Sequence, residues 1–354
     1  MPTEVPIAQP IIGEEEKAAV IGVLESGNVA QGEKVAEFEA AFAEYVGAKH
    51  AVAVSSGTAA IHLSLLAHGA KNGTEVITTP FSFISTANSI LHCGARAVFA
   101  DVETSSFNLD PKAVKELITP FTRVVMPVHL YGNPANLDAF KRLANWHGLA
   151  IVEDACQAHG AIYKGQKIGS FNTTCFSFYP SKNMTTAEGG MVTTNNESIA
   201  WNVRNMRQHG VSGKQVGFNY RMTDIQAAVG IEQLKKLDGF NEARRKNAEL
   251  LTEGLSEIVM CPVEAEGSTH CWHQYTIRVT KQRQAILTAL HEAGINARVY
   301  YETPINLMSP YSGNLKHMPR AEKLAKHVIS LPVHPGVTEE NIAKMVEVIT
   351  CALA

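Results

Sequence analysis

The chain has 354 residues, of which 45% are hydrophobic and 18% are charged. This length predicts about two domains, and this balance argues against an intrinsically disordered protein. The 31 Lys and Arg residues and the 34 Asp and Glu residues leave a formal net charge of −3, which gives the chain no global electrostatic reason to bind nucleic acid or an anionic membrane.

Strand and helix patterns alternate along the first part of the chain. Apolar residues at helical spacing predict helices over residues 14–26 and 33–46, which end at Gly27 and Gly47. Short apolar runs predict strands over residues 50–54, 75–79, 96–100, 123–128, 149–152, 173–178 and 190–194. Helical segments separate the first five strands, at residues 57–68, 85–92, 111–118 and 137–147. This alternation indicates an α/β fold with a mainly parallel sheet that is covered on both faces.

The last third of the chain opens with a long helical pattern over residues 223–255, whose polar face is rich in Lys and Arg. We then expect a strand at 275–280, a helix at 282–293, and helical stretches at 321–329 and 338–349. Because the long helix is the natural link to a second unit, we place the domain boundary near residue 240. The chain then divides into a large domain over 1–240 and a small domain over 241–354.

The segment Ser55-Ser56-Gly57-Thr58-Ala59 follows the first predicted strand and opens a helix. Glycine allows the backbone to approach a ligand closely, and the new helix offers free N–H groups and the positive end of its dipole. These features suit a phosphate group, and a simple serine cap is the alternative when the segment is taken alone. The spacing matches neither GxGxxG nor a P-loop, so it predicts no dinucleotide or P-loop site.

Two acids, Glu153 and Asp154, end an apolar strand. Because side chains alternate along a strand, the two carboxylates face opposite sides and are not expected to act as a paired acid and base. Ligands of open α/β sheets bind at the carboxyl ends of the strands. One of the two acids can therefore bind a metal, pair with a cation or hold a protonated ring nitrogen, with a helix cap as the alternative.

Lys182 lies in a turn with Pro180 and Ser181, between two predicted strands. Most lysines are solvated surface charges, but in a poorly solvated cleft the pKa of a lysine falls and its amine becomes a nucleophile. A helix N-terminus, a carboxylate and a lysine together supply what pyridoxal phosphate needs for its phosphate, its ring nitrogen and its aldehyde. The lysine can then move the substrate proton as general base and acid.

Several motifs in order give the chain a resemblance to a known family. It is similar to the DegT/DnrJ/EryC1/StrS family of pyridoxal-phosphate aminotransferases, which act mainly on nucleotide-linked keto sugars. The matching segments are Ser56-Gly-Thr-Ala59, Val128-His-Leu-Tyr-Gly132, Glu153-Asp-Ala-Cys-Gln157, Ser177-Phe-Tyr-Pro-Ser-Lys182 and Leu331-Pro332. The resemblance implies the aspartate-aminotransferase-like fold (fold type I), with a seven-stranded-type sheet in the large domain and a smaller C-terminal α+β domain. It also implies a homodimer with composite active sites.

The resemblance assigns roles to residues of the three motifs. Lys182 would form the Schiff base with the cofactor, and Asp154 would pair with the pyridinium nitrogen. Gln157 would lie against the cofactor ring or its hydroxyl, and Phe83 would stack on the ring. The phosphate would be held by Gly57, Thr58, Ala59 and Ser177.

Two further segments match the family near the substrate. In Phe218-Asn-Tyr-Arg-Met222, Asn219 matches the asparagine that reaches the cofactor phosphate of the other subunit, and Arg221 matches an arginine near the substrate; composition alone gives only a polar loop. Tyr300 and Asn306 stand where members commonly have histidines, in a loop that borders the sugar pocket, so Tyr300 is a candidate substrate contact. A lysine at position 182, where a dehydrase branch has histidine, favours transamination.

Other polar clusters receive plainer interpretations. His270-Cys271-Trp272-His273 has too few ligands at unconvincing spacing for a metal, so we expect no metal site and treat Cys271 and His273 as packing or loop residues. Cys156 is expected to be a small buried neighbour of Asp154. Solvated helix faces are expected for the basic residues Arg204, Arg207, Lys235, Lys236 and 244–246.

No apolar stretch approaches the roughly 20 residues that a bilayer requires, and the first ten residues lack the basic and apolar regions of a signal peptide. The six cysteines show no CxxC pair, which is typical of reduced, mostly buried thiols. We therefore expect a cytoplasmic protein.

Together these observations predict a homodimeric aminotransferase that moves the amino group of L-glutamate to the keto group of a nucleotide-linked sugar, forming an amino sugar for a surface glycan or a glycosylated metabolite. A cyclic keto polyol of the keto-inositol type is an alternative acceptor. A second alternative is a regulatory or binding protein that kept the fold without catalysis, and the presence of both Lys182 and Asp154 argues against it.

Overall fold

The computed structural model describes residues 4–311 and 317–353. A seven-stranded sheet has the order β1-β9-β8-β5-β4-β2-β3. Its strands are β1 (His50–Val54), β2 (Glu75–Thr78), β3 (Arg96–Phe99), β4 (Thr122–Met126), β5 (Ala150–Asp154), β8 (Thr173–Ser177) and β9 (Gly190–Thr194). Strand β9 is antiparallel to both of its neighbours, and the other neighbouring pairs are parallel. The predicted mainly parallel sheet is therefore confirmed.

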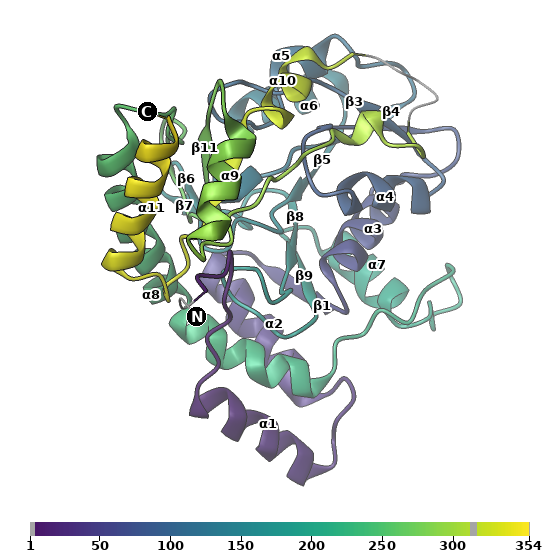
Figure 1. The fold of residues 1–354 in the computed structure, drawn as a ribbon. Coiled ribbons are helices and arrows are strands. Elements are labelled where there is room, and N and C mark those ends of the chain that lie inside the picture. Colours follow the sequence, from purple (N-terminus) through teal and green to yellow (C-terminus); the bar gives the residue numbers. More distant parts are fainter. Residues whose placement is uncertain (1–3, 312–316, 354) are drawn as a thin grey trace.

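Helices cover both faces of this sheet (Figure 1). One face packs against α2 (Glu33–Val46), α6 (Leu137–His147) and the first half of α8 (Asp224–Leu255). The other packs against α3 (Gly57–Ala67), α4 (Ser85–His92) and α7 (Glu197–Arg207). In β1, Ala53 joins the first core and Val54 the second, because successive side chains of a strand point to opposite faces.

The long helix α8 continues from the large sheet into a smaller unit with its own apolar core. This unit contains an antiparallel pair of strands, β11 (Tyr275–Arg278) and β12 (Val328–Leu331), with α9 (Arg283–Glu292) and α11 (Glu339–Leu353) packed around them. Figure 1 shows α9, α11 and β11 gathered on the left of the molecule. Residue 240, the proposed boundary, lies inside α8.

The remaining elements are short. They are α5 (Pro111–Lys115), α10 (Pro319–Ala325), the 3-10 turns η1 (Leu130–Gly132) and η2 (Ile305–Leu307), and a three-stranded sheet of β10 (Ser268–Thr269), β6 (Ile162–Tyr163) and β7 (Gln166–Lys167). Within residues 4–311 and 317–353, no helix combines the length and the apolar character needed to cross a bilayer.

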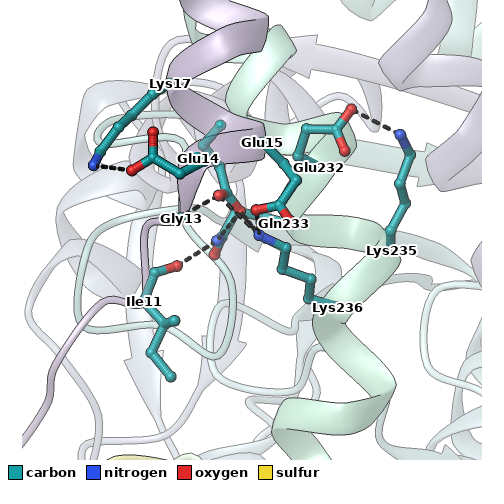
Figure 2. A network of polar contacts seen from close by, with 10 residues as sticks. Ile11, Gly13, Glu14, Glu15, Lys17, Glu232, Gln233, Lys235 and Lys236 are labelled. Carbon is teal, nitrogen blue, oxygen red and sulfur yellow. Dashed lines mark hydrogen bonds and ion pairs between the residues drawn. The ribbon is translucent and has the colours of Figure 1, made fainter.

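The N-terminal helix α1 (Glu14–Ser26) projects from the body of the molecule and is fastened to α8 (Figure 1). Figure 2 shows the network that fastens it. The buried carboxylate of Glu16 accepts the N–H of Gly13 at 2.7 Å and lies 2.8 Å from Lys236 Nζ. Gln233 Nε2 donates to Glu16 Oε1 at 2.8 Å and to the carbonyl of Ile11 at 2.7 Å. Polar groups therefore hold α1 in place.

One predicted helix is wrong in its second half. Residues 321–329 were expected to be helical, but α10 ends at Ala325 and Val328 begins strand β12. Ile329 pairs with Ile277 of β11, and this pairing over about 50 residues of sequence supplies the backbone partners that override local helical spacing.

Three basic residues expected on solvated faces lie elsewhere. Arg207 is buried and donates to Glu39 and to the carbonyl of Ala53. Arg244 is also buried, and Lys236 pairs with Glu16. A polar stripe marks the side of a helix that avoids apolar packing, but it does not show whether carbonyls or carboxylates from another segment cover that side.

Candidate active site

A cavity of about 500 Å³ opens where several strands of the large sheet end. It is lined by residues that follow β1, β2, β4, β5 and β8, together with residues 273–274 and 300–301 from the second part of the chain. Candidate residues in its wall are Gly57, Thr58, Phe83, Asp154, Gln157, Ser177, Lys182 and Tyr300. The topology therefore brings together motifs that lie more than 200 residues apart in sequence.

Lys182 lies half-buried in this cavity, and its backbone N–H donates to the carbonyl of Tyr179 at 2.9 Å to close the turn. Burial lowers the pKa of the Lys182 amine, and the nearby Cys156 thiol and Asp154 carboxylate only partly oppose that shift. Among the described residues the amine has no hydrogen bond or ion pair. It is therefore an amine biased toward its neutral, nucleophilic form.

Asp154 is buried at the end of β5, and its carboxylate is held at both oxygens. Oδ2 accepts the hydroxyl of Thr86 at 2.8 Å, and Oδ1 accepts the N–H of Cys156 at 3.1 Å. The neighbouring Glu153 makes a separate set of contacts, with His129 Nε2 at 2.9 Å and Asn172 Nδ2 at 2.8 Å. As the strand alternation predicts, only the second acid lines the cavity.

The start of α3 forms another part of the wall. Ser56 caps the helix by accepting the N–H of Ala59 at 3.1 Å, so the earlier N–H groups of Gly57 and Thr58 have no partner within the helix. A Cβ on Gly57 would lie 2.6 Å from the Cβ of Ser177 and 3.0 Å from Cys156 Sγ. Only glycine leaves this cradle open, whereas the buried Ala59 does not line the cavity.

On a third side of the cavity, hydrogen bonds join Gln157 to Tyr131 and Tyr301. Gln157 Oε1 accepts the N–H of Tyr131 at 2.7 Å, and its Nε2 donates to the hydroxyl of Tyr301 at 3.1 Å. The hydroxyl of Tyr131 donates in turn to the carbonyl of Tyr300. Phe83 is 56% exposed beside this region, so its ring is open to a flat ligand.

Asn219 and Arg221, like Ala59, are candidates that do not line this cavity. Both are exposed on the segment between α7 and α8. Phe218 and Tyr220 stack with ring centroids 5.0 Å apart, and the carbonyl of Tyr220 accepts the N–H of Ser55 at 2.8 Å. The segment is thus attached beside the Ser55–Gly57 turn, with its two polar candidates directed outward.

Several residues of the wall were absent from the sequence interpretation. Thr86, Tyr131 and Tyr301 orient the predicted residues, and their signal lies in tertiary contacts that a pattern does not show. His273, expected to be a packing or loop residue, is a buried loop residue that also lines the cavity next to Gln274. Cys156, expected to be buried, is half-buried in the wall, and burial raises the pKa of its thiol well above the ordinary value.

The described residues contain no candidate metal site. Across residues 4–311 and 317–353 there is no group of three or more His, Cys, Asp or Glu side chains that could hold a metal ion. In the segment once considered for a metal, His270 instead stacks on Trp272 with ring centroids 4.1 Å apart. The groups that the cavity offers to a ligand include the Lys182 amine, the Asp154 carboxylate and the N–H groups at the start of α3.

Comparisons with known proteins identify similar sequences over nearly the whole chain. The model of the DegT/DnrJ/EryC1/StrS aminotransferase family matches residues 10–350. The chain is 36% identical to a GDP-perosamine synthase of Caulobacter vibrioides, with 96% of each chain covered. It is 40% identical to a protein of Geobacillus stearothermophilus named as a pleiotropic regulatory protein, with 92% of this chain and 91% of that one covered.

The solved structures agree with the sequence comparisons. The structure of PseC of Helicobacter pylori, an aminotransferase involved in the biosynthesis of pseudoaminic acid, superposes with a TM-score of 0.94. It is 30% identical, and the match covers 99% of each chain. The expected fold type and family are thus confirmed.

Proposed function

Because the chain belongs to the DegT/DnrJ/EryC1/StrS aminotransferase family, we propose that it moves an amino group from L-glutamate to the keto group of a nucleotide-linked sugar. Pyridoxal phosphate would be its cofactor. The observation that carries the proposal is the joint position of the Lys182 amine and the Asp154 carboxylate in one cavity beside the open cradle at Gly57. The enzyme would work in the cytoplasm, and its product would serve a glycan or a glycosylated metabolite.

The donor set of the cavity fits the groups of this cofactor. The free N–H groups of Gly57 and Thr58 and the hydroxyl of Ser177 suit the phosphate, at the positive end of α3. Ala59 would contribute indirectly, because its N–H donates to the capping hydroxyl of Ser56 rather than to the ligand. The Asp154 carboxylate suits the ring nitrogen, the amide of Gln157 the ring hydroxyl, and the exposed Phe83 ring the cofactor plane.

Lys182 and Asp154 would divide the chemistry between them. The bound cofactor supplies an electron sink for the charge that develops when a proton leaves the substrate carbon. Asp154, whose carboxylate accepts the hydroxyl of Thr86 and the N–H of Cys156, would hold a proton on the ring nitrogen. Lys182 Nζ, biased toward the neutral form by burial, takes the substrate proton and returns it to the neighbouring atom.

The outward direction of Asn219 and Arg221 supports a homodimer with shared sites. In this proposal Asn219 reaches the phosphate in the cavity of a second copy, and Arg221 lies near the substrate there. Tyr300, in the wall of the cavity, would contact the substrate from the same copy as Lys182. The smaller unit after residue 240 would contribute to the site through residues 273–274 and 300–301 of the cavity wall.

A regulatory role is the second candidate, and the name of the Geobacillus stearothermophilus relative favours it. The two candidates differ in one observable property, which is a reaction with an amino donor. An acceptor of the keto-inositol type would differ only in the second substrate.

The first experiment is an absorbance spectrum of the purified protein after incubation with pyridoxal phosphate, followed by addition of L-glutamate. We expect a visible band from cofactor bonded to Lys182, and we expect glutamate to bleach it. A protein that takes up no cofactor would overturn the proposal and favour the regulatory role. A band that D-glutamate bleaches as fast as L-glutamate would contradict the proposed donor.

A further inference from the structure

His62 is a buried histidine that has no part in the proposed reaction. It lies on the second turn of α3, five residues after Gly57, and it is only 4% exposed. It does not line the cavity that holds Lys182, so we expect no direct contact with the cofactor or the substrate there. Because burying a polar ring is costly unless it has suitable neighbours, the groups that surround His62 call for an explanation.

The ring of His62 packs against the segment Phe218–Arg221. Its centroid lies 4.9 Å from that of the Phe218 ring and 6.0 Å from that of the Tyr220 ring. A long polar contact of 3.5 Å joins His62 Nδ1 to the hydroxyl of Tyr220. The two aromatic rings are themselves stacked, with centroids 5.0 Å apart. His62 therefore supports both aromatic residues of this segment from the side of α3.

Aromatic and polar residues alternate along the segment Phe218–Arg221. Phe218 and Tyr220 are partly buried, whereas Asn219 and Arg221 are exposed. Successive side chains of an extended chain point to opposite sides, so a contact that fixes the aromatic side also fixes the direction of the polar side. His62 is therefore placed to set the direction of Asn219 and Arg221 through the two rings.

Backbone hydrogen bonds hold the same segment at other points. The N–H of Tyr220 donates to the carbonyl of Arg207 at 2.9 Å, and the carbonyl of Tyr220 accepts the N–H of Ser55 at 2.8 Å. These bonds position the backbone, whereas the rotamers of the side chains depend on what the rings pack against. His62 supplies part of that packing.

The environment of His62 favours a neutral ring. Burial lowers the pKa of His62 to about 4, and the neighbouring His92 on α4 adds to that shift. The ring centroids of the two histidines lie 5.6 Å apart. A neutral imidazole can pack against Phe218 and still offer a ring nitrogen to the hydroxyl of Tyr220. Phenylalanine at position 62 would keep the packing and remove the polar contact, which makes it an informative substitution.

We propose that His62 is a positioning residue that orients Asn219 and Arg221 toward the cavity of a second copy of the chain. This inference rests on the proposed function, in which these two residues complete the cofactor and substrate site of the partner. His62 thus acts on a cavity that does not contain the Lys182 of its own chain. Its loss weakens the partner's site and leaves the site of its own chain complete.

The first test compares homodimers. In absorbance titrations with pyridoxal phosphate, we expect His62→Ala to raise the Kd of the cofactor about 10-fold, and we expect His62→Phe to restore most of the affinity. At saturating cofactor and L-glutamate, the rate constant of the first half-reaction should stay within about 2-fold, because Lys182 and Asp154 are unaltered. His147→Ala, which removes an exposed histidine of α6, is the matched control and should change neither quantity.

Mixed dimers separate an effect on the partner from a local loss of structure. They are isolated from differently tagged chains, and the visible band reports only cavities that contain Lys182. When a His62→Ala chain is paired with a Lys182→Ala chain, the one cavity with Lys182 faces a segment supported by an intact His62. We expect that cavity to bind pyridoxal phosphate as tightly as the unaltered protein does.

The reverse pairing should give the opposite result. Here one chain carries both His62→Ala and Lys182→Ala, and its partner is unaltered. The one cavity with Lys182 then faces the altered segment, and we expect it to show the weak binding of the His62→Ala homodimer. If His62→Ala does not fold, His62→Leu, which fills the space without an aromatic ring, takes its place in both pairings.

Three results would overturn the inference. If the first mixed dimer bound the cofactor as weakly as the His62→Ala homodimer does, His62 would act on its own cavity through the fold. Equal affinities of the unaltered and His62→Ala homodimers would show that His62 positions nothing. An unaltered protein that forms the visible band as a monomer would leave the cofactor assignment intact and remove the second copy. Failure of the proposed function is distinct, because an unaltered protein without any visible band is recognised before a substitution is made.

Discussion

Glu16 and Asp154 are buried carboxylates that each lie near a lysine. At the root of α1, Glu16 accepts hydrogen bonds from Lys236, Gln233 and Gly13. Figure 2 shows Lys236, Gln233 and Gly13 gathered at this point. In the cavity, each oxygen of Asp154 accepts one hydrogen bond, from the hydroxyl of Thr86 and from the N–H of Cys156. The side-chain amine of Lys182 makes no hydrogen bond or ion pair within residues 4–311 and 317–353.

The difference shows in the pKa values of the two lysines. For Lys236, desolvation is outweighed by the hydrogen bonds to Glu16 and Glu15, and its pKa is raised. For Lys182, desolvation outweighs the attraction of Cys156 and Asp154, and its pKa is lowered. A lysine beside a carboxylate thus forms an ion pair at Glu16, whereas beside Asp154 the lysine has a lowered pKa. The two sites differ in the donors to the carboxylate. Glu16 accepts hydrogen bonds from its lysine as well as from neutral groups, whereas Asp154 accepts them from Thr86 and Cys156.

Lys182→Ala should have the largest effect, because no other described amine lines the cavity. We expect the visible cofactor band to be absent and amino transfer to fall by about 10⁴-fold. Stopped-flow absorbance with L-glutamate measures both. Lys115→Ala, which removes an exposed lysine on α5, is the matched control and should behave as the unaltered chain does. A Lys182→Ala variant with a normal band would end the assignment.

Asp154→Asn should have the next largest effect. The neutral amide cannot hold the proton on the ring nitrogen, and it turns an N–H group toward either Thr86 or Cys156, which already act as donors. We expect retained cofactor binding with a loss of amino transfer of about 10²- to 10³-fold, as found when a preorganised electrostatic group is removed. The measurement is single-turnover kinetics beside a cofactor titration.

The matched control for Asp154 is Thr86→Val, which removes one hydrogen bond to Oδ2 and keeps the charge. Its loss of rate should be smaller than that of Asp154→Asn. If the two variants were equally slow, hydrogen bonding rather than charge would be the contribution of this site. Near-normal rates in Asp154→Asn would remove Asp154 from the reaction.

The sequence predicts one of these two regions much better than the other. Lys182 and Asp154 follow strands in a regular strand–helix alternation, and the edge of a parallel sheet collects whatever follows its strands, so their meeting could be foreseen. The contacts of Glu16 with Lys236 and Gln233 join positions more than 200 residues apart and carry no periodic signal. The basic residues of α8 therefore predicted a solvent-exposed helix face, whereas the fold places Glu16 against Lys236.

The same limit applies within the cavity. Motifs identified the residues expected to touch the cofactor, but the residues that orient them, such as Thr86 and Tyr301, are ordinary in their local context. Arg244 shows this most clearly. Its place in a charged run of a helix indicated exposure, yet carbonyls of the His270–Gln274 segment cover it.

Glu16→Gln should have the smallest of the three effects and should act on stability. The amide keeps the geometry, but it leaves Lys236 without its buried charge partner and places an N–H group among donors. Because Lys236 is partly solvated, we expect the free energy of unfolding at pH 7 to fall by about 2 kcal/mol, less than for a fully buried pair. Urea denaturation measures the change, and Glu14→Gln on the exposed side of α1, paired only with Lys17, should change little.

The pH dependence separates the charge of Glu16 from its shape. Burial alone would raise its pKa, but the hydrogen bonds from Lys236, Gln233 and Gly13 outweigh burial and leave the pKa of the folded state below its ordinary value. Its contribution is therefore complete above the unfolded-state pKa of about 4.3 and is lost as the pH falls through the folded-state value. The difference in stability between the unaltered chain and Glu16→Gln should close as the pH falls below about 4. A difference that stayed constant from pH 7 to 3 would mean that packing at the root of α1, rather than the ion pair, holds this helix in place.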